Sequence, residues 1–286
     1  MTDYQWYPGH MTKALRMMKE NIGLVDLVIE LADARIPRSS RNPDLDSLSA
    51  GKSRLVILNK ADLADDKQTS LWVDALTENG TVACAFNSKE SSSLKSIRDM
   101  ITTACAERIE RDRKRGLVGR PVRAMIVGIP NVGKSTFINR LSGKKAAKTG
   151  NKPGVTRGKQ WIAVDSKLQL LDTPGVLWPK FGDPETGRNL ALIGSLNDEN
   201  INLEELSLDL ISILGRSYPG ILEKRYGLDS TGAEKSDVSP EVLSQIASAK
   251  KLLRAGAVPD TERAASLILD EFRSGKLGRI SLEGRN

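Results

Sequence analysis

The sequence has few of the residues from which metal sites, disulfides or membrane spans are built. It contains one histidine, His10, and two cysteines, Cys84 and Cys105, in 286 residues. A lone histidine and two cysteines within apolar patterns do not form a zinc site, and they are typical of reduced core thiols in a cytoplasmic protein. No apolar run reaches the roughly 20 residues of a membrane span, and the N-terminus lacks the pattern of a signal peptide, so we expect no membrane partner.

Aromatic residues are also scarce, whereas basic residues are in excess and give a net charge of +7. Residues 1–177 carry 29 Lys and Arg against 19 Asp and Glu, and residues 178–286 carry 14 against 17. Two basic clusters carry most of the excess: Arg108, Arg111, Arg113, Lys114, Arg115, Arg120 and Arg123, and then Lys144, Lys145, Lys148, Lys152, Arg157 and Lys159. The first cluster could be only a solvated face, whereas the second lies beside the phosphate site described below and indicates a polyanion such as RNA.

The hydrophobic periodicity changes partway along the chain, which is long enough for two domains. Strands are predicted at 24–31, 54–58, 81–86, 122–127, 160–164 and 168–171, with helices at 11–21, 66–78, 93–111 and from Thr136. This alternation indicates an α/β domain with a mostly parallel sheet and helices on both faces. From residue 178 to 286 only helical periodicity remains, with helices expected at 189–196, 203–214, 220–226, 240–255 and 261–274.

The segment Gly128-Ile129-Pro130-Asn131-Val132-Gly133-Lys134-Ser135 follows a predicted strand and opens a predicted helix. That setting is typical of a P-loop, in which backbone N–H groups at the helix start form a nest for phosphates. Nucleotide contacts are expected from Asn131, Val132, Gly133, Lys134, Ser135 and Thr136. Lys134 would act on the β and γ phosphates, and the Ser135 hydroxyl would ligate Mg²⁺.

Two further motifs predict a guanine nucleotide. Asn59-Lys60-Ala61-Asp62 ends a predicted strand, and the Asp62 carboxylate can accept from N1–H and N2–H₂ of guanine, a donor pair that adenine does not present. Asp172-Thr173-Pro174-Gly175 places Asp172 where it would hold Mg²⁺ through water, and the Gly175 amide near the γ-phosphate. The remaining predicted contacts are Thr156, which would cap Mg²⁺ only when the γ-phosphate is present, and the strand-end residues Asn87, Ser88 and Lys89.

The order of the motifs differs from that of an ordinary GTPase, in which the P-loop comes first and Asn-Lys-x-Asp last. Here the guanine-reading motif precedes the P-loop. A fold can be cut at one surface loop and rejoined at another, and the charged, glycine-rich segment 113–121 is suited to be the joining loop. The sequence therefore predicts a circularly permuted Ras-like P-loop GTPase domain at residues 1–177, followed by an all-helical domain at residues 178–286.

With these motifs the chain resembles the YlqF/RbgA family of circularly permuted ribosome-biogenesis GTPases over nearly its whole length. The matching segments are 6–11, 33–37, 59–62, 128–135, 153–157 and 172–180. Tyr7 replaces a frequent Phe and Lys159 a frequent Gln, and neither has a phosphate-binding role. The resemblance implies GTP hydrolysis as a switch, binding to the large ribosomal subunit and its rRNA, and action late in subunit assembly. Spacing alone predicts only a permuted GTPase with a helical appendage.

The catalytic set is expected to include Lys134, Thr156 and His10. The glutamine that usually follows Asp-x-x-Gly is absent, and undoing the permutation places His10 in the segment after it. The resemblance also implies that this histidine positions the attacking water, although it could instead cap the following helix or bind RNA. Asn131 matches the asparagine that helps to hold potassium in cation-stimulated GTPases, although it could be only a turn residue.

Several alternatives stay open at this level. Asp33 and Arg35 could contact nucleotide or RNA, or form an ion pair. The chain could also be an ATP-dependent P-loop enzyme, or a GTP-dependent RNA-binding sensor with little hydrolysis. We expect a monomer with low intrinsic turnover, and we expect deletion of residues 181–286 to abolish subunit binding while sparing nucleotide binding.

Overall fold

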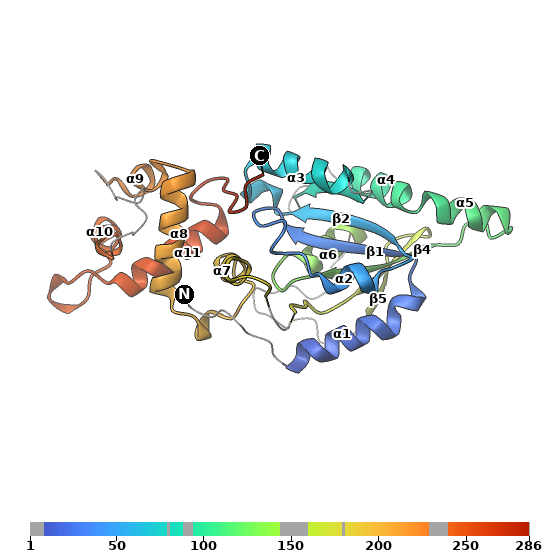
Figure 1. Cartoon of the computed structure of the whole chain (residues 1–286), viewed down its shortest axis with the longest axis horizontal. Helices are drawn as coiled ribbons and strands as arrows, with labels where there is room; N and C mark the ends of the chain where they lie inside the picture. The colour runs from blue at the N-terminus through green and yellow to red at the C-terminus, as the bar shows by residue number, and fades with distance from the viewer. Residues whose placement is uncertain are drawn as a thin grey trace.

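The protein is described from a computed structural model that covers residues 9–78, 81–87, 94–143, 160–178, 181–228 and 240–285, with side chains from residue 11 onward. Its two parts are a sheet flanked by helices and a group of helices beside it (Figure 1). No helix within these ranges has both the length and the apolar character needed to cross a membrane.

Within the described residues, the sheet has six strands in the order β3-β2-β1-β4-β6-β5. The strands are β1 Leu27–Asp33, β2 Ser53–Asn59, β3 Val82–Phe86, β4 Val122–Gly128, β5 Gln160–Ala163 and β6 Leu168–Asp172. All neighbours pair in parallel except β5, which runs antiparallel to β6 at the edge. Asp33 lies opposite Asn59 in the register, and Ile126 lies opposite Asp172. The mostly parallel sheet is confirmed, and its strands deliver the predicted motifs to one edge.

The helices around the sheet are α1 Gly9–Asn21, α2 Asp44–Leu48, α3 Asp66–Glu78, α4 Leu94–Ala104, α5 Ala106–Lys114 and α6 Lys134–Ser142. The helix predicted at 66–78 is confirmed, but the single helix predicted at 93–111 is wrong. Cys105 has non-helical ψ of 8° and separates α4 from α5. The Cys105 N–H still donates to the carbonyls of Ile101 and Thr102. Because the helical hydrogen bonding continues up to the break, the apolar pattern of the sequence does not reveal it.

The helical part contains α7 Pro184–Leu192, α8 Leu203–Ser217, α9 Ile221–Tyr226, α10 Glu241–Ala249 and α11 Thr261–Ser274. Helix α7 begins before the predicted residue 189, because the Asp183 carboxylate accepts a 2.7 Å hydrogen bond from Thr186 N and caps it. Helix α10 ends before the predicted residue 255, because the chain turns at Lys251, whose φ is 56°. Single 3₁₀ turns lie at Ile22–Leu24, Ala61–Leu63, Asp198–Asn200 and Ala255–Ala257.

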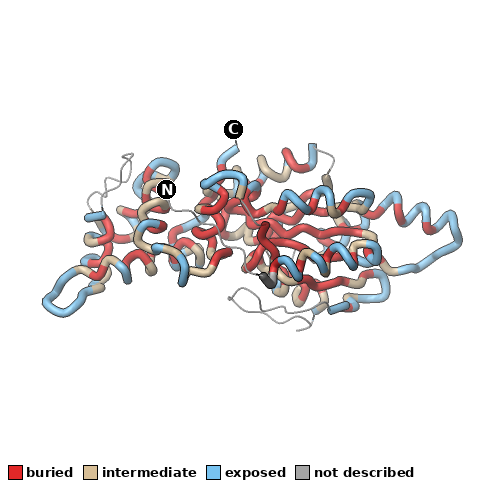
Figure 2. Tube along the Cα trace, turned by 60° about the horizontal axis from the view of Figure 1, so that its bottom comes forward, coloured by how far each residue is buried: buried red, intermediate tan, exposed pale blue. Residues whose placement is uncertain are grey.

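One hydrophobic core continues from the sheet into the helical part (Figure 2). It includes Leu27 and Ile126 of the sheet, Leu177 of the segment after β6, and Leu190 and Leu210 of α7 and α8. All five side chains are fully buried. The helical part is therefore packed on the sheet part, and the two are more than tethered neighbours.

The C-terminal tail, residues 275–285, leaves α11 and returns to the sheet part beside α3 (Figure 1). Leu282 N donates a 2.9 Å hydrogen bond to the carbonyl of Arg35, and Trp72 Nε1 donates to the carbonyl of Glu283 at 3.2 Å. The tail has no periodicity, so the sequence does not predict this return. A domain boundary near residue 177 would therefore assign to the second domain a tail that packs against the first.

Candidate nucleotide-binding site

The P-loop runs from β4 to α6 and is packed too closely for a side chain at two of its glycines. Gly128 has φ of 151°, and a Cβ there would lie 2.5 Å from the carbonyl oxygen of Leu31. Gly133, with φ of 100°, directly precedes α6, and its Cβ would lie 2.5 Å from Asn59 Nδ2. These contacts are the physical reason for glycine at the first and sixth positions of the motif.

Lys134 is buried at the centre of this loop. Its ammonium group donates to the carbonyls of Gly128 at 3.0 Å and Ile129 at 2.7 Å. Burial lowers the pKa of Lys134 to about 8, although the Asp172 carboxylate opposes the shift and the Lys60 charge adds to it. A cation is thus held inside the loop, at the cost of part of its basicity.

The guanine-reading motif is joined directly to the P-loop. Asn59 is buried, and its Nδ2 donates a 2.8 Å hydrogen bond to the carbonyl of Val132. Lys60 has the left-handed φ of 58°, and Asp62 follows in a 3₁₀ turn. The structure brings the two predicted motifs together in space. The contacts of Asn59, Lys60 and Asp62 with a nucleotide stay predictions.

Asp33 and Arg35 form a buried ion pair, which decides among the alternatives left open by the sequence. Arg35 donates from Nε to Oδ1 at 2.9 Å and from Nη2 to Oδ2 at 2.8 Å, and Lys60 Nζ lies 3.1 Å from Oδ2. Burial alone would raise the pKa of Asp33, but the charges of Arg35 and Lys60 hold it far below its usual range. The Arg35 guanidinium also stacks 5.2 Å from the ring centre of Phe272 in α11. The pair therefore connects the guanine-reading lysine with the helical part.

The segment after β6 lies against the P-loop. Thr173 Oγ1 donates to the carbonyl of Ile126 at 2.6 Å, and a Cβ at Gly175 would lie 2.8 Å from Pro130 Cα and 3.0 Å from Lys134 Nζ. Asp172 is buried, and its carboxylate is near enough to Lys134 to affect the pKa of that lysine.

A magnesium ion fits the chemistry of this donor set. Ser135 is in the first turn of α6, directly after Lys134, and the Asp172 carboxylate is near Lys134. Oxygen donors next to a phosphate nest are what Mg²⁺ requires when it binds together with a nucleotide.

The P-loop also contacts the helical part, which the sequence does not predict. Asn131 Nδ2 donates to the carbonyl of Gly194 at 2.7 Å, and Ser195 Oγ donates to the carbonyl of Pro130 at 2.9 Å. Asn131 has φ of 57°, which suits its alternative interpretation as a turn residue. Because its amide nitrogen is engaged, its amide oxygen is the atom with which it could coordinate a cation.

Several predicted residues lie outside the described parts of the structure. They are Ser88, Lys89, Thr156 and the second basic cluster, Lys144 to Lys159. His10 is in the first turn of α1, and only its backbone is described. Asn87 is half-buried directly after β3. Their predicted roles stay predictions.

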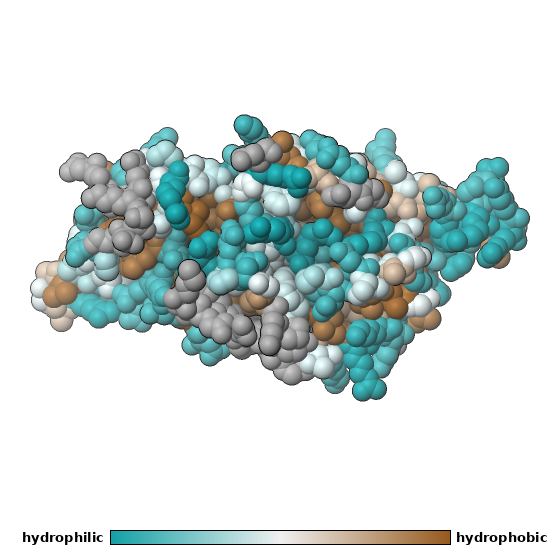
Figure 3. Space-filling view, in the orientation of Figure 1, coloured by the Kyte–Doolittle hydropathy of each residue, from teal (hydrophilic) through white to brown (hydrophobic). Residues whose placement is uncertain are grey.

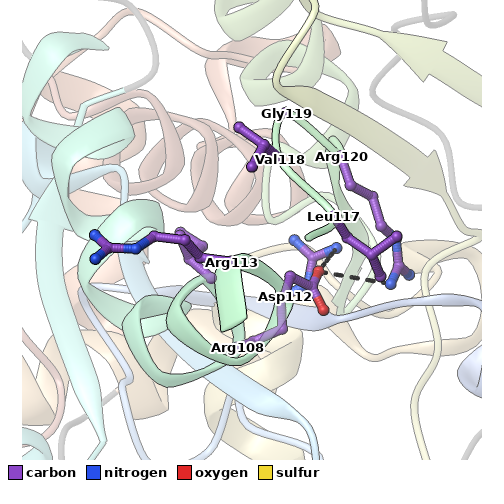
Figure 4. A pocket seen from close by; sticks show the side chains of 8 residues that line it. Arg108, Asp112, Arg113, Leu117, Val118, Gly119 and Arg120 are labelled. Atoms are coloured by element: carbon purple, nitrogen blue, oxygen red, sulfur yellow. Dashed lines mark ion pairs between the residues drawn. The ribbon is translucent and has the colours of Figure 1, made fainter. Parts of the chain in front are cut away.

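The residues of the first basic cluster are neighbours in the sequence, but they do not form one surface in the structure. Arg108 lies 3.2 Å from Asp26 and 3.0 Å from Asp112, and Arg120 lies 3.2 Å from Asp26. Arg108, Asp112 and Arg120 also line an open hollow of about 140 Å³ beside the joining segment, where Asp112 pairs with both arginines (Figure 4). Arg123 is also engaged, because it stacks 5.6 Å from the ring centre of Trp161.

The other basic residues of this cluster lie on a projection that we call the basic arm, residues 109–119. They are Arg111, Arg113, Lys114 and Arg115, all exposed, and the exposed apolar pair Leu117 and Val118 follows them in the chain. This end of the molecule is strongly hydrophilic (Figure 3). It is remote from the P-loop, at the far end of α5 (Figure 1).

Comparison with known proteins identifies relatives along the whole chain. A family model described as a 50S ribosome-binding GTPase matches residues 123–216, from β4 into α8. Ribosome biogenesis GTPase A of Priestia megaterium is 43% identical over 280 residues, which cover 98% of this chain and 96% of that protein. The protein of the same name from Bacillus cereus is 42% identical, with 98% and 93% covered. The GDP-bound structure of Thermotoga maritima YlqF superposes with a TM-score of 0.69 at 30% identity, covering 93% of this chain and 98% of that one.

Proposed function

This chain is a GTPase that belongs to the ribosome biogenesis GTPase A family, and we propose that it binds the large ribosomal subunit and switches off by hydrolysing GTP late in assembly. The name of its relatives and the words "50S ribosome-binding" in the family description support the choice of partner. The observation that carries the nucleotide half is the 2.8 Å hydrogen bond from Asn59 to Val132. It joins the guanine-reading motif to the P-loop although the two are in permuted order along the chain.

Guanine would be selected by Asp62. Its carboxylate accepts from the two donors on the guanine edge, whereas adenine presents an acceptor at N1 and would offer the carboxylate no donor there. Asn59 takes part indirectly, because its amide is used to fix the P-loop against this motif. A buried acceptor that loses its donors costs about 1–3 kcal/mol, which favours GTP over ATP.

The phosphates would lie over the N-terminus of α6. The backbone N–H groups there and the Lys134 ammonium would bind them, and Lys134 would exchange its two carbonyl partners for phosphate oxygens. Ser135, Thr156 and Asp172 would hold Mg²⁺, which neutralises charge on the β and γ phosphates. The Gly175 amide would sense the γ-phosphate.

Hydrolysis would be slow without the ribosome. His10 would position the attacking water in place of the missing glutamine, and a potassium ion on the Asn131 amide oxygen would supply the charge of an arginine finger. The α1 helix that begins beside His10 follows directly from the segment that the permutation places after Gly175.

The rRNA contact would use two basic surfaces. The basic arm presents Arg111, Lys114 and Arg115 at the end of α5, and the second cluster lies beside the phosphate site in sequence. The helical domain, residues 178–286, has a slight negative balance, so it would bind by shape and local sites and the basic surfaces would supply the salt-dependent attraction.

The test is single-turnover hydrolysis with and without the purified large subunit. We expect the subunit to accelerate phosphate release, and His10→Ala to lower the rate by about two orders of magnitude or less while GTP affinity survives. Reduced GTP affinity with unchanged chemistry would assign His10 a structural role. A rate that the subunit does not change would contradict the proposed function.

A further inference from the structure

We propose that the C-terminal tail, residues 275–285, is a positioning element of the guanine site, through which the helical part sets the affinity for guanine nucleotides. This inference rests on the proposed reading of guanine by Asp62. It concerns the end of the nucleotide opposite to the γ-phosphate, so it is separate from the hydrolytic switch.

The tail binds the backbone of the guanine-reading loop on both sides of Asp62. Arg279 Nη2 donates to the carbonyl of Ala61 at 2.8 Å, and Arg279 Nε donates to the carbonyl of Ala64 at 2.9 Å. The backbone N–H of Ile280 donates to the carbonyl of Leu63 at 2.9 Å. Three of the four carbonyls of residues 61–64, those of Ala61, Leu63 and Ala64, thus accept hydrogen bonds from the tail.

The fit is also close sterically. A Cβ at Gly275 would lie 2.6 Å from Leu63 Cδ2, and Leu63 itself is only 8% exposed. Arg279 is further held by a bidentate ion pair with Asp66 in the first turn of α3. The guanidinium is therefore fixed in the orientation that reaches both carbonyls of the loop.

The tail also makes hydrogen bonds with the helical part. The Tyr218 hydroxyl, at the end of α8, accepts from Ser281 N at 2.9 Å and lies 3.2 Å from its carbonyl. The buried Glu283 carboxylate accepts from Asn189 Nδ2 of α7 at 3.3 Å and, on the side of the sheet, from Ser39 N at 3.0 Å. Each of these residues would have to move if α7 and α8 shifted against the sheet.

A second connection reaches the same loop from its other end. Lys60 is paired with Asp33, Asp33 with Arg35, and Arg35 stacks on Phe272 while its carbonyl accepts from Leu282 N. The residues on both sides of Ala61 are therefore positioned by groups of the helical part and the tail. Since coupling between two sites is reciprocal, a partner that shifts the helical part would change guanine nucleotide affinity, and nucleotide would in turn stabilise the docked tail.

Arg279→Ala tests the proposal, with Arg285→Ala as the matched control. Arg285 is on the same tail, but its guanidinium stacks on Trp72 of α3, 5.3 Å from the ring centre, and its N–H donates to Gln68 Oε1 at 2.6 Å. We expect Arg279→Ala to weaken binding of GDP and of a non-hydrolysable GTP analogue equally, by about tenfold, which is the size of one or two ordinary hydrogen bonds. Arg279→Lys, with one donor group, should recover part of the loss, and Arg285→Ala should bind like the wild type.

Base discrimination distinguishes a misplaced Asp62 from a general loss of nucleotide affinity. Inosine diphosphate lacks the N2 amino group, so a misplaced Asp62 should narrow the preference for GDP over inosine diphosphate. Arg279→Ala with wild-type GDP affinity and wild-type preference would overturn the inference. Failure of the wild type to prefer guanine nucleotides would instead overturn the proposed function on which it rests.

A measurement on the wild type applies even if Arg279→Ala does not fold. Hydrogen–deuterium exchange at residues 276–283 should slow when GDP is added, because nucleotide and tail stabilise the same loop. Exchange in this segment that is unchanged by saturating GDP would overturn the inference. On this view, deletion of residues 181–286 would also weaken nucleotide binding, which is the opposite of the expectation from the sequence.

Discussion

The side-chain amide of Asn131 in the P-loop donates a 2.7 Å hydrogen bond to the carbonyl of Gly194, the second residue after α7. The Ser195 hydroxyl makes a parallel contact with the carbonyl of Pro130 at 2.9 Å. The phosphate-binding loop and the helical part therefore share hydrogen bonds. Asn131, which is predicted from its sequence position to bind a cation, is also part of the contact between the two parts. An experiment on Asn131 must therefore separate these two roles.

Hydrolysis should be faster in potassium chloride than in sodium chloride of equal ionic strength, and Asn131→Ala should remove that difference. The physical reason is that the amide oxygen would be lost as a cation ligand. Ser195→Ala is the matched control, because it removes the neighbouring hydrogen bond to the P-loop but leaves the amide in place, and it should keep the potassium effect. Equal wild-type rates in the two salts would leave Asn131 with a role in the turn and in packing alone.

Asp62→Asn should shift nucleotide preference from GTP toward xanthosine triphosphate. The substitution replaces an acceptor with a group that also donates, and xanthine carries an oxygen where guanine carries its N2 amino group. Competition binding of the two nucleotides measures the change. Asp74→Asn, on the exposed face of α3, serves as the control and should prefer GTP. An Asp62→Asn protein that binds GTP like the wild type would show that guanine is read elsewhere.

The sequence predicted the sheet and the motifs because both depend on local patterns. β-branched runs predicted the strands, and the P-loop and Asn-Lys-x-Asp are contiguous segments at strand ends. The contacts of Arg279 with Ala61 and of Arg35 with Phe272 could not be predicted in the same way. They join residues more than two hundred positions apart, through a tail without periodicity, and only the packed helical part brings them together.

The ion pairs of the first basic cluster are a second example of contacts that could not be predicted from local sequence patterns. Arg108 and Arg115 look alike in a run of charges, yet Arg108 is 6% exposed and paired with Asp26, the residue directly before β1. That partner is distant in sequence, so charge counting overstated the free positive surface. Helix α7 is a different case, because Asp183 and Pro184 are a recognisable N-cap and first helical residue, from which the start of α7 could have been predicted.

GDP affinity should fall as pH rises through the pKa of Lys134, which burial lowers to about 8. Only the protonated lysine attracts phosphate, so the neutral form above that pH must take up a proton in order to bind. Raising the pH from about 7 to about 8.5 should weaken binding by roughly fourfold, with uptake of protons on binding at the higher pH. Calorimetry in buffers of different ionisation enthalpy measures both quantities. Affinity that is constant over this range would mean that Lys134 stays charged in the free protein.

Asp33→Ala should destabilise the fold by about 3–5 kcal/mol, because it leaves the buried charges of Arg35 and Lys60 without their carboxylate. Urea unfolding measures the change. The pKa of Asp33 is held below its unfolded value, so its contribution is present above the unfolded pKa and is lost only as pH falls through the folded one. The difference from wild type should therefore be the same at pH 7 and pH 5. Glu185→Gln, which breaks the exposed pair with Arg38, should cost less than about 1 kcal/mol.

The last prediction separates the basic arm from the switch. Replacing Arg111, Lys114 and Arg115 together by Ser removes exposed charges that lie far from the P-loop, so GTP hydrolysis in the free protein should be unchanged. Binding to the large subunit should weaken, and the dependence of log affinity on log salt should become shallower by about one for each phosphate that the arm no longer neutralises. The wild type should bind the subunit more tightly with a non-hydrolysable GTP analogue than with GDP, and the variant should keep that ratio. An unchanged salt slope would exclude the arm from RNA binding, whereas equal wild-type affinity in the two nucleotide states would contradict the switch itself.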